Sequence, residues 1–250
     1  PFLKWLKNKK NHFLTWQQVE HNICLLSEYL SESLSKGDRC VLLSENRPEW
    51  LIADLAIMTL GAITTPAYTT NTSDDHLHLL RDSGAKTIIV STENLLEKLM
   101  PAARKVPAIE MVVIMDQSVT LDVGDFNISR WGDLLSEGPL LGRDKLIDVI
   151  NRTDSACIIY TSGTSGNPKG VLLSHGAILC NCTGAHMFLG DVPGFKQGCE
   201  TFLSFLPLSH SYEHTCGQFL PISIGAQIFY AEGPDKLVAN MAEVQPTIIA

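Results

Sequence analysis

Long apolar runs are missing from this 250-residue sequence, and basic residues are in the minority. No uninterrupted apolar stretch approaches the ~18 residues that a membrane-spanning helix needs, and the N-terminus has no apolar signal core. Lysine and arginine number 19 against 27 aspartates and glutamates, for a formal net charge of -8. These absences exclude a general affinity for nucleic acid, so we expect a cytoplasmic protein whose phosphate-binding surface is local.

Paired cysteine motifs are also missing. The seven cysteines include no C-x-x-C pair, and several lie in apolar runs such as "SACIIY". This pattern is typical of reduced, buried thiols in a cytosolic protein rather than of a disulfide framework. A zinc site built on Cys180 and Cys182 is disfavoured because a single residue separates them.

Segments with helical and with strand periodicity alternate along the chain. An amphipathic pattern predicts a helix from Thr15 to Gly37, with Thr15 and Gln18 as a capping box, and the apolar strand "RCVLLS" follows. The alternation continues to "MVVIMD" and resumes at "SACIIY". Strands separated by helices of this length imply right-handed crossovers, so we predict an α/β fold of mostly parallel sheets covered by helices on both faces.

Two such α/β units are expected, roughly residues 15–116 and 153–250, joined by a polar connection. The lysine-rich opening "PFLKWLKNKK" is interpreted as a solvated flank rather than as a membrane-surface helix. The sequence begins with Pro1 and stops within a stretch that is typical of a buried strand. We therefore interpret the chain as part of a larger domain.

The stretch "YTSGTSGNPKG", Tyr160–Gly170, follows a buried strand and so lies at a sheet edge, where α/β proteins bind ligands. Its glycines allow backbone N–H groups to face a polyphosphate, its hydroxyls add donors, and Lys169 supplies a positive charge. It is not a Walker loop, because Pro168 precedes the lysine, and it does not match G-x-G-x-x-G. The sequence predicts a phosphate-binding loop, with an ordinary surface connection as the alternative.

The order of these residues, followed by "VLLSH", closely resembles the signature of the adenylate-forming superfamily: acyl-CoA synthetases, luciferases and peptide-synthetase adenylation domains. The stretches "FLTWQQV", "GDRCVLLSENRPEWLIADLAIMTLGAITTPAY" and "LPLSHSYEHTCG" also resemble their counterparts, so the resemblance covers essentially the whole chain. "NRPEW" and "LPLSHSYE" resemble the long-chain fatty acid–CoA ligases. The resemblance implies a truncated N-terminal AMP-binding domain of layered αβαβα architecture, without the C-terminal domain.

The resemblance also implies the residues of the site. Those expected to hold the ATP phosphates are Thr161, Ser162, Gly163, Thr164, Ser165, Gly166, Asn167, Pro168 and Lys169. Thr161 is the expected Mg²⁺ contact, Lys169 and His210 are the expected catalytic residues, and His210 would lie beside the substrate carboxylate. Two interpretations stay open for Tyr212, Glu213 and His214: the mouth of an acyl or CoA tunnel, or a polar helix start.

Other residues receive structural interpretations. Trp50 and Tyr68 are interpreted as core or interface aromatics, and His175 as a residue that supports the loop or caps a helix.

The implied activity is that of a long-chain fatty acid–CoA ligase, an AMP-forming acid–thiol ligase. A fatty acid carboxylate attacks ATP to form an acyl-adenylate and release pyrophosphate, and the thiol of coenzyme A, the co-substrate, then displaces AMP; Mg²⁺ accompanies the ATP. The alternatives are an aryl- or medium-chain acyl-CoA ligase, another adenylating enzyme, or a nucleotide-binding fragment without turnover. A lipid substrate leaves peripheral association with a membrane surface open, and nothing in the sequence indicates an oligomeric state.

We expect the 250-residue stretch alone to be inactive. The family's adenine and ribose motifs, the glutamate that completes the Mg²⁺ site and the C-terminal lysine lie beyond its last residue.

Overall fold

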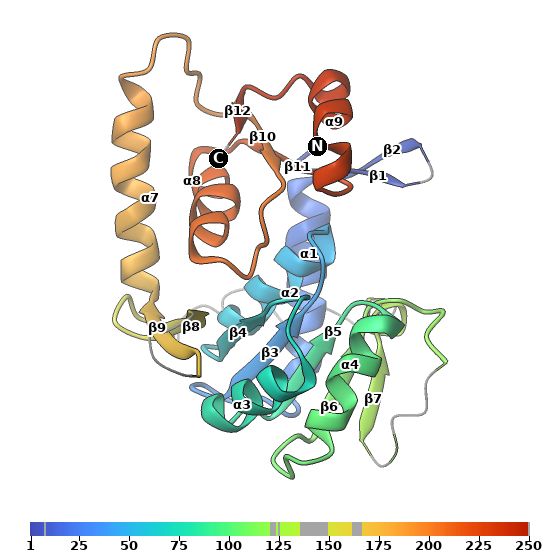
Figure 1. Cartoon of the computed structure of the whole chain (residues 1–250). Coiled ribbons are helices and arrows are strands. Elements are labelled where there is room, and N and C mark those ends of the chain that lie inside the picture. The colour runs from blue at the N-terminus through green and yellow to red at the C-terminus, as the bar shows by residue number, and fades with distance from the viewer. Residues whose placement is uncertain (8, 121–123, 125, 136–149, 162–166, 250) are drawn as a thin grey trace. The chain divides into compact units, whose positions relative to one another are not determined.

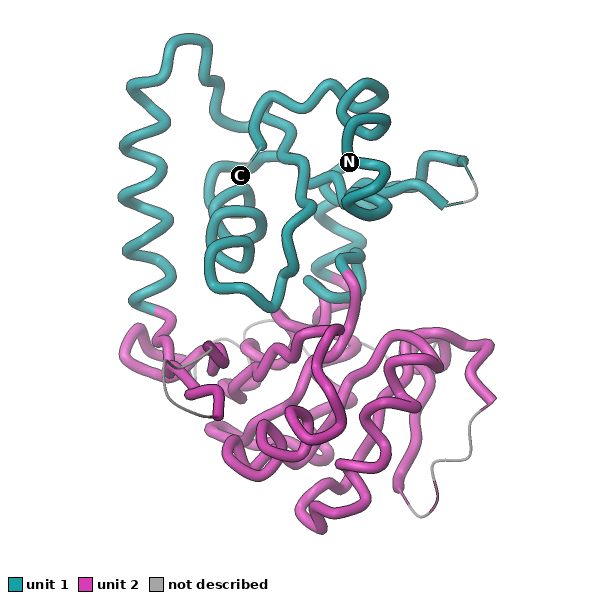
Figure 2. The backbone as a smooth tube through the Cα atoms, in the orientation of Figure 1, with its two compact units in different colours: residues 1–20, 46–51, 176–250 teal, residues 21–45, 52–175 magenta. Residues whose placement is uncertain are grey.

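The computed structural model describes residues 1–7, 9–120, 124, 126–135, 150–161 and 167–249. They form two compact units (Figure 1, Figure 2). Unit 1 comprises residues 1–20, 46–51 and 176–250, and unit 2 comprises residues 21–45 and 52–175. This division differs from the two consecutive stretches expected from the sequence, because the chain crosses between the units several times.

Unit 2 is built on a seven-stranded sheet. In spatial order its strands are β7 (Asn127–Arg130), β6 (Met111–Ile114), β5 (Thr87–Val90), β3 (Arg39–Leu43), β4 (Ile63–Ala67), β8 (Ser155–Thr161) and β9 (Lys169–Ser174). All neighbouring pairs are parallel except β8 and β9, which run antiparallel. Residues 155–174, which were expected in the C-terminal unit, belong to this sheet because β8 pairs with β4 at Thr64↔Cys157.

Helices pack on this sheet through the alternating side chains of its buried strands. Helices α3 (Ser73–Ser83) and α4 (Glu93–Ala103) bury Leu80 and Leu96 in one core cluster with Val41 of β3. Helices α1 (Trp16–Leu30) and α2 (Pro48–Thr59) contribute residues to both units, and the Ser27 hydroxyl joins them by donating to the carbonyl of Ala56 at 3.0 Å.

The expected polar connection between the units contains secondary structure of its own. Strand β7 pairs with the edge of β6, and the short helix α5 (Trp131–Leu134) buries Trp131. Arg130 anchors the segment by donating to the carbonyls of Gln117 at 3.2 Å and Val119 at 2.9 Å. The connection was predicted from polarity alone, and polarity does not exclude a strand at a sheet edge.

Unit 1 contains a five-stranded sheet. Its spatial order is β12 (Ile248–Ile249), β10 (Thr201–Ser204), β11 (Gln227–Tyr230), β1 (Leu3–Lys7) and β2 (Lys10–Leu14). The N-terminal stretch, expected to be a solvated flank, is therefore a hairpin whose strand β1 pairs in parallel with β11. Phe2 and Leu3 are fully buried, and the Phe2 ring stacks on Trp16.

Unit 1 also contains helical segments. Helix α7 (His175–Gly190) follows β9 of unit 2 and lies in unit 1 from residue 176. Helix α9 (Leu237–Val244) packs Leu237 and Val244 against the core cluster of Leu203, Phe229 and Ala231. The helix expected between Tyr212 and Gly225 is a π-helix, Glu213–Phe219, followed by α8 (Leu220–Ile224). Among the helices that the structure describes, none has both the length and the apolarity needed to cross a bilayer.

Candidate functional site

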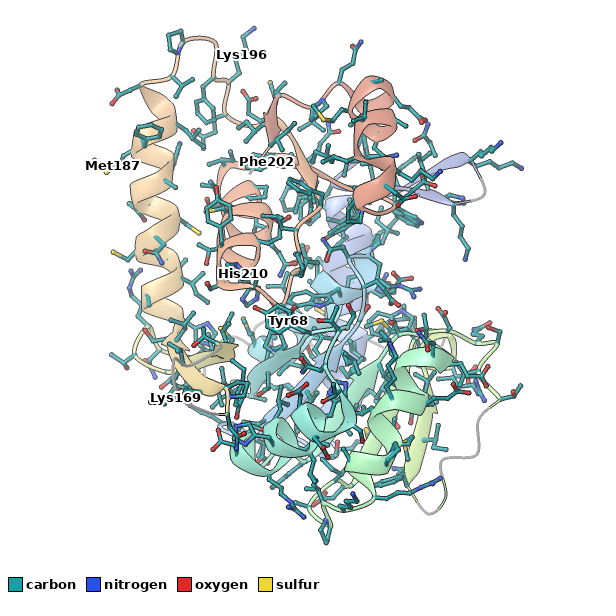
Figure 3. All side chains as sticks on the ribbon, viewed as in Figure 1. Tyr68, Lys169, Met187, Lys196, Phe202 and His210 are labelled. Atoms are coloured by element: carbon teal, nitrogen blue, oxygen red, sulfur yellow. The ribbon has the colours of Figure 1, made fainter. Side chains whose placement is uncertain are left out.

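The predicted phosphate-binding loop joins the antiparallel strands β8 and β9. Thr161 and Lys169 are Cα partners at the open end of this hairpin, so the two ends of the loop lie opposite each other. Both side chains are exposed, as is Asn167, whereas Pro168 is half-buried (Figure 3 labels Lys169). The predicted residues Ser162, Gly163, Thr164, Ser165 and Gly166 lie outside the described residues. The hairpin thus presents a hydroxyl and an ammonium group at its mouth.

Gly170 allows the hairpin to close tightly. A Cβ atom at this position would lie 2.7 Å from Cγ2 of Ile158 and 3.1 Å from Cζ of Tyr160, its direct cross-strand partner. The ring of Tyr160 therefore covers the glycine. Burial, and then the carboxylate of Asp82, raise the pKa of Tyr160, whose hydroxyl donates to Asp82 Oδ2 at 2.7 Å. The phenol is a neutral structural donor and not a base.

A cavity of about 260 Å³ lies beside the hairpin within unit 2. Its lining comprises Tyr68, Thr70, Asn71, Asp75, His78, Leu79, Tyr160 and Pro168. Tyr68, interpreted as a core or interface aromatic, is half-buried on this cavity, and burial raises the pKa of its hydroxyl. The cavity thus joins the loop to residues of α3 and of the segment after β4.

His78, Tyr160 and Asp82 are partners of the loop that were not expected from the sequence. His78 Nε2 lies 2.8 Å from the carbonyl oxygen of Pro168, and its ring meets Tyr160 edge-on at 6.1 Å. One signal was available: His78 and Asp82 are four residues apart, a spacing that places both on one face of a helix. That spacing does not indicate which loop the face contacts.

His210 belongs to unit 1, whereas the hairpin belongs to unit 2. Its side chain is exposed on the turn after β10, directly before the π-helix (Figure 3). The backbone N–H of Tyr212 donates to His210 Nδ1 at 3.2 Å. Because Nδ1 accepts this hydrogen bond, the neutral ring carries its proton on Nε2 and can donate from there.

A buried polar network holds the turn that carries His210. Asn46 donates to the carbonyl of Leu206 at 2.6 Å, and its Oδ1 accepts from the N–H of Leu208 at 3.1 Å. Ser204, which is fully buried, donates to Glu213 Oε1 at 2.5 Å. The turn is therefore positioned by Ser204 and Glu213, which flank it, and by Asn46, which is about 160 residues away in the sequence.

Of the cluster Tyr212–His214, only Tyr212 is exposed; Glu213 and His214 are buried. The ring of His214 packs edge-on against Trp50 at 5.4 Å, which places Trp50 in the core as expected. A Cβ atom at Gly217 would lie 2.4 Å from Glu213 Oε1, so the π-helix requires glycine opposite this carboxyl. Tyr212–His214 thus lie at a helix start, as one of the two interpretations expected, with Glu213 and His214 buried in the protein.

Burial raises the pKa of Glu213 to about 7, while its hydrogen bonds from Ser204 and the Phe205 backbone oppose the shift. The folded-state pKa exceeds the unfolded value of 4.5, so the native state holds an extra proton between these values. Its contribution to stability is complete below about pH 4.5 and is lost as pH rises toward 7.

We therefore expect Glu213→Gln to gain stability relative to the wild type between pH 5 and pH 8, by at most roughly 3 kcal/mol. Burial lowers the pKa of the His76 imidazole to about 4, so the contribution of His76 to stability increases with pH. This contribution is the same in the wild type and the variant. Melting temperatures at the two pH values measure the difference, with the exposed Glu110→Gln as control. A wild-type-to-variant difference that does not change with pH contradicts the prediction.

His175 is the first residue of α7, and its N–H donates to the carbonyl of Asp154 at 3.0 Å. Burial lowers the pKa of its ring, and Nε2 is buried without a hydrogen-bond partner among the described residues. His175 thus supports the start of a helix. Within the described part of the chain, no group of three or more His, Cys, Asp or Glu side chains has the arrangement of a metal site.

Comparison with known proteins identifies relatives of the chain. The long-chain-fatty-acid–CoA ligase ACSBG2 of Mus musculus is 32% identical over 259 residues, covering 99% of this chain and 38% of that protein. The long-chain-fatty-acid–CoA ligase ACSBG1 of Homo sapiens is 30% identical over 224 residues, covering 88% of this chain and 31% of that protein. The chain therefore spans about a third of the length of these curated relatives.

Solved structures share the fold. The anthranilate CoA ligase AuaEII in complex with anthranoyl-AMP superposes with a TM-score of 0.83 at 21% identity, covering 98% of this chain and 45% of that chain. A putative long-chain-fatty-acid CoA ligase from Rhodopseudomonas palustris superposes with a TM-score of 0.80 at 19% identity, covering 99% of this chain and 58% of that chain. The predicted α/β class of mostly parallel sheets with helices is confirmed. A family model described as "AMP-binding enzyme" matches residues 1–250, and the chain therefore belongs to this family of adenylate-forming enzymes.

Proposed function

We propose that the full-length protein is a long-chain fatty acid–CoA ligase. It activates a fatty acid with ATP as an acyl-adenylate and transfers the acyl group to coenzyme A. The observation that carries this proposal is the 30–32% identity to long-chain-fatty-acid–CoA ligases, together with the exposed pair Thr161 and Lys169 at the hairpin mouth. Because the chain spans about a third of those relatives, the activity is proposed for the full-length protein.

In this proposal the hairpin binds the β- and γ-phosphates of ATP. Lys169 contributes an exposed ammonium group that is directed by the start of β9, and phosphate is a strong acceptor for such a donor. The Thr161 hydroxyl fits Mg²⁺, which prefers a few oxygen ligands completed by water and substrate phosphates. Mg²⁺, when bound, supplies charge neutralisation of the triphosphate.

His210 would act on the other substrate. With Nδ1 engaged by the N–H of Tyr212, the ring presents an Nε2–H donor toward the exposed side. A donor aimed at a carboxylate oxygen orients the acid for attack and does not remove a proton, since a fatty acid is already ionised at neutral pH. The role we propose for His210 is therefore orientation and electrostatic support, not general-base catalysis.

Carboxylate-dependent pyrophosphate exchange by the full-length protein tests the proposed function. We expect palmitate and similar long-chain acids to support exchange and benzoate-like acids to fail. Exchange with aryl or medium-chain acids alone assigns the protein to another adenylating activity. ATP binding without exchange for any acid supports the nucleotide-binding alternative and contradicts the proposal.

A further inference from the structure

We infer that His78 is a positioning residue for the phosphate-binding hairpin: it holds the β9 end of the loop against helix α3. The inference rests on the proposed function, in which Thr161 and Lys169 contact the triphosphate. His78 itself would touch no phosphate, since its Nε2 atom is engaged by the protein backbone.

The contact is direct and its direction is determined. His78 Nε2 lies 2.8 Å from the carbonyl oxygen of Pro168, and a carbonyl oxygen only accepts hydrogen bonds. The Nε2 atom must therefore carry a proton, whether the ring is neutral or charged. Pro168 immediately precedes Lys169, so the bond fixes the peptide group that joins the proline to the predicted phosphate-binding lysine.

A second contact holds the other strand of the hairpin to the same helix face. Asp82, one helical turn after His78, accepts the hydroxyl hydrogen bond of Tyr160 at 2.7 Å. Tyr160 directly precedes Thr161 and lies edge-on to the His78 ring at 6.1 Å. Helix α3 thus contacts the residue before each of the two loop ends that are proposed to bind ATP and Mg²⁺.

Helix α3 can hold the hairpin in place because both of its ends are capped. Thr72 and Asp75 form a capping box, and Gly84 ends the helix in the left-handed conformation at φ 60. Arg39 of β3 donates to the carbonyls of Ser83 at 2.6 Å and Gly84 at 2.7 Å. These bonds attach the helix to the central strand of the sheet. The hydrogen bond from His78 therefore connects the hairpin to the core of unit 2.

Packing does not duplicate this bond. Strand β9 is last in the strand order and pairs with β8, and its residues 169–172 are exposed. The cavity of about 260 Å³ lies where His78 and Pro168 approach each other. Because Pro168 borders this cavity and lies outside the β8–β9 register, which ends at Lys169, loss of the hydrogen bond allows this residue to shift.

The test compares His78→Gln with His78→Asn in the full-length protein. The amide nitrogen of glutamine reaches nearly as far as Nε2 and keeps the donor, whereas asparagine is equally polar but too short. In pyrophosphate exchange we expect His78→Asn to raise the KM for ATP about fivefold with little change in kcat, and His78→Gln to stay within about twofold of wild type. The KM for the acid is expected to stay unchanged in both variants.

Hydrogen exchange gives a readout that does not depend on activity. Without nucleotide, amides in residues 167–174 should exchange faster in His78→Asn than in the wild type and His78→Gln. His21→Asn, an exposed histidine of α1, is the control and should change neither readout. Equal KM values and equal amide exchange in all four proteins overturn the inference, as does a glutamine variant as impaired as the asparagine variant.

The two proposals fail in different ways. A wild-type protein that supports no pyrophosphate exchange with any acid refutes the proposed function. In that event the amide exchange of residues 167–174 still decides whether His78 holds the hairpin. If His78→Asn does not fold, the glutamine variant decides alone, since wild-type-like amide exchange supports the inference and accelerated amide exchange overturns it.

Discussion

His210→Ala is expected to lower the rate of carboxylate-dependent adenylation by at least about 100-fold, the cost of removing one well-placed donor from a charge-stabilising site. The exposed ring has its Nδ1 engaged by the Tyr212 N–H, so alanine removes a single directed Nε2–H group. We expect kcat to fall more than the KM for ATP rises, because His210 would contact the acid. Pyrophosphate exchange with palmitate measures both parameters.

His210→Gln distinguishes orientation from proton transfer. Glutamine can donate a hydrogen bond but cannot act as a base at neutral pH, so it should recover a substantial part of the lost rate if His210 acts as a donor. His12→Ala, an exposed histidine of β2, serves as the control. A glutamine variant as slow as the alanine variant argues for general-base catalysis, and a full rate in His210→Ala removes the residue from the mechanism.

Lys169→Ala is expected to weaken ATP binding by at least about tenfold. One charge-assisted hydrogen bond to phosphate is worth roughly 1.5–3 kcal/mol, and the exposed Lys169 ammonium is opposite Thr161 at the hairpin mouth. Isothermal titration of full-length protein with ATP and Mg²⁺ measures the change directly. Raising the salt concentration should reduce the difference between wild type and variant, since part of the contact is Coulombic.

Lys169→Arg and Lys105→Ala are the matched variants for this prediction. Arginine keeps the charge with a different shape and should give an intermediate affinity. Lys105 is an exposed lysine after α4 and should give wild-type affinity. An unchanged ATP affinity and adenylation rate in Lys169→Ala would show that the hairpin does not bind the triphosphate through this side chain.

Local features of the fold were predictable because their hydrogen bonds join residues close in sequence. The capping box of α1 forms as expected: the Thr15 N–H donates to Gln18 Oε1 at 2.9 Å, and the Gln18 N–H donates to Thr15 Oγ1 at 3.2 Å. Helix α3 begins in the same way, with Thr72 as its N-cap and Asp75 completing the capping box. Such contacts depend on side chains three residues apart, so the sequence contains all the information that they require.

Contacts between distant residues were not predictable in this way. Leu3 pairs with Ile228, and this pairing makes the lysine-rich stretch a strand of the unit 1 sheet, in which Leu3 is buried and Lys7 is exposed. The π-helix at Glu213 depends on a carboxyl group placed between Ser204 and Gly217. The periodicity of a sequence predicts which face of a helix or strand is apolar, but it does not identify the distant element that packs against that face.

The sequence by itself determined the family and the loop expected to bind phosphate, because both follow from a long motif of adjacent residues. It also determined the alternation of helices and strands, because this follows from the local periodicity of apolar residues. Only the tertiary structure decided what holds that loop. His78 lies 90 residues before Pro168 and Asp82 lies 78 residues before Tyr160, and these hydrogen bonds exist only when α3 packs beside the hairpin. A hydrogen bond depends on distance in space, and folding alone brings these donors and acceptors together.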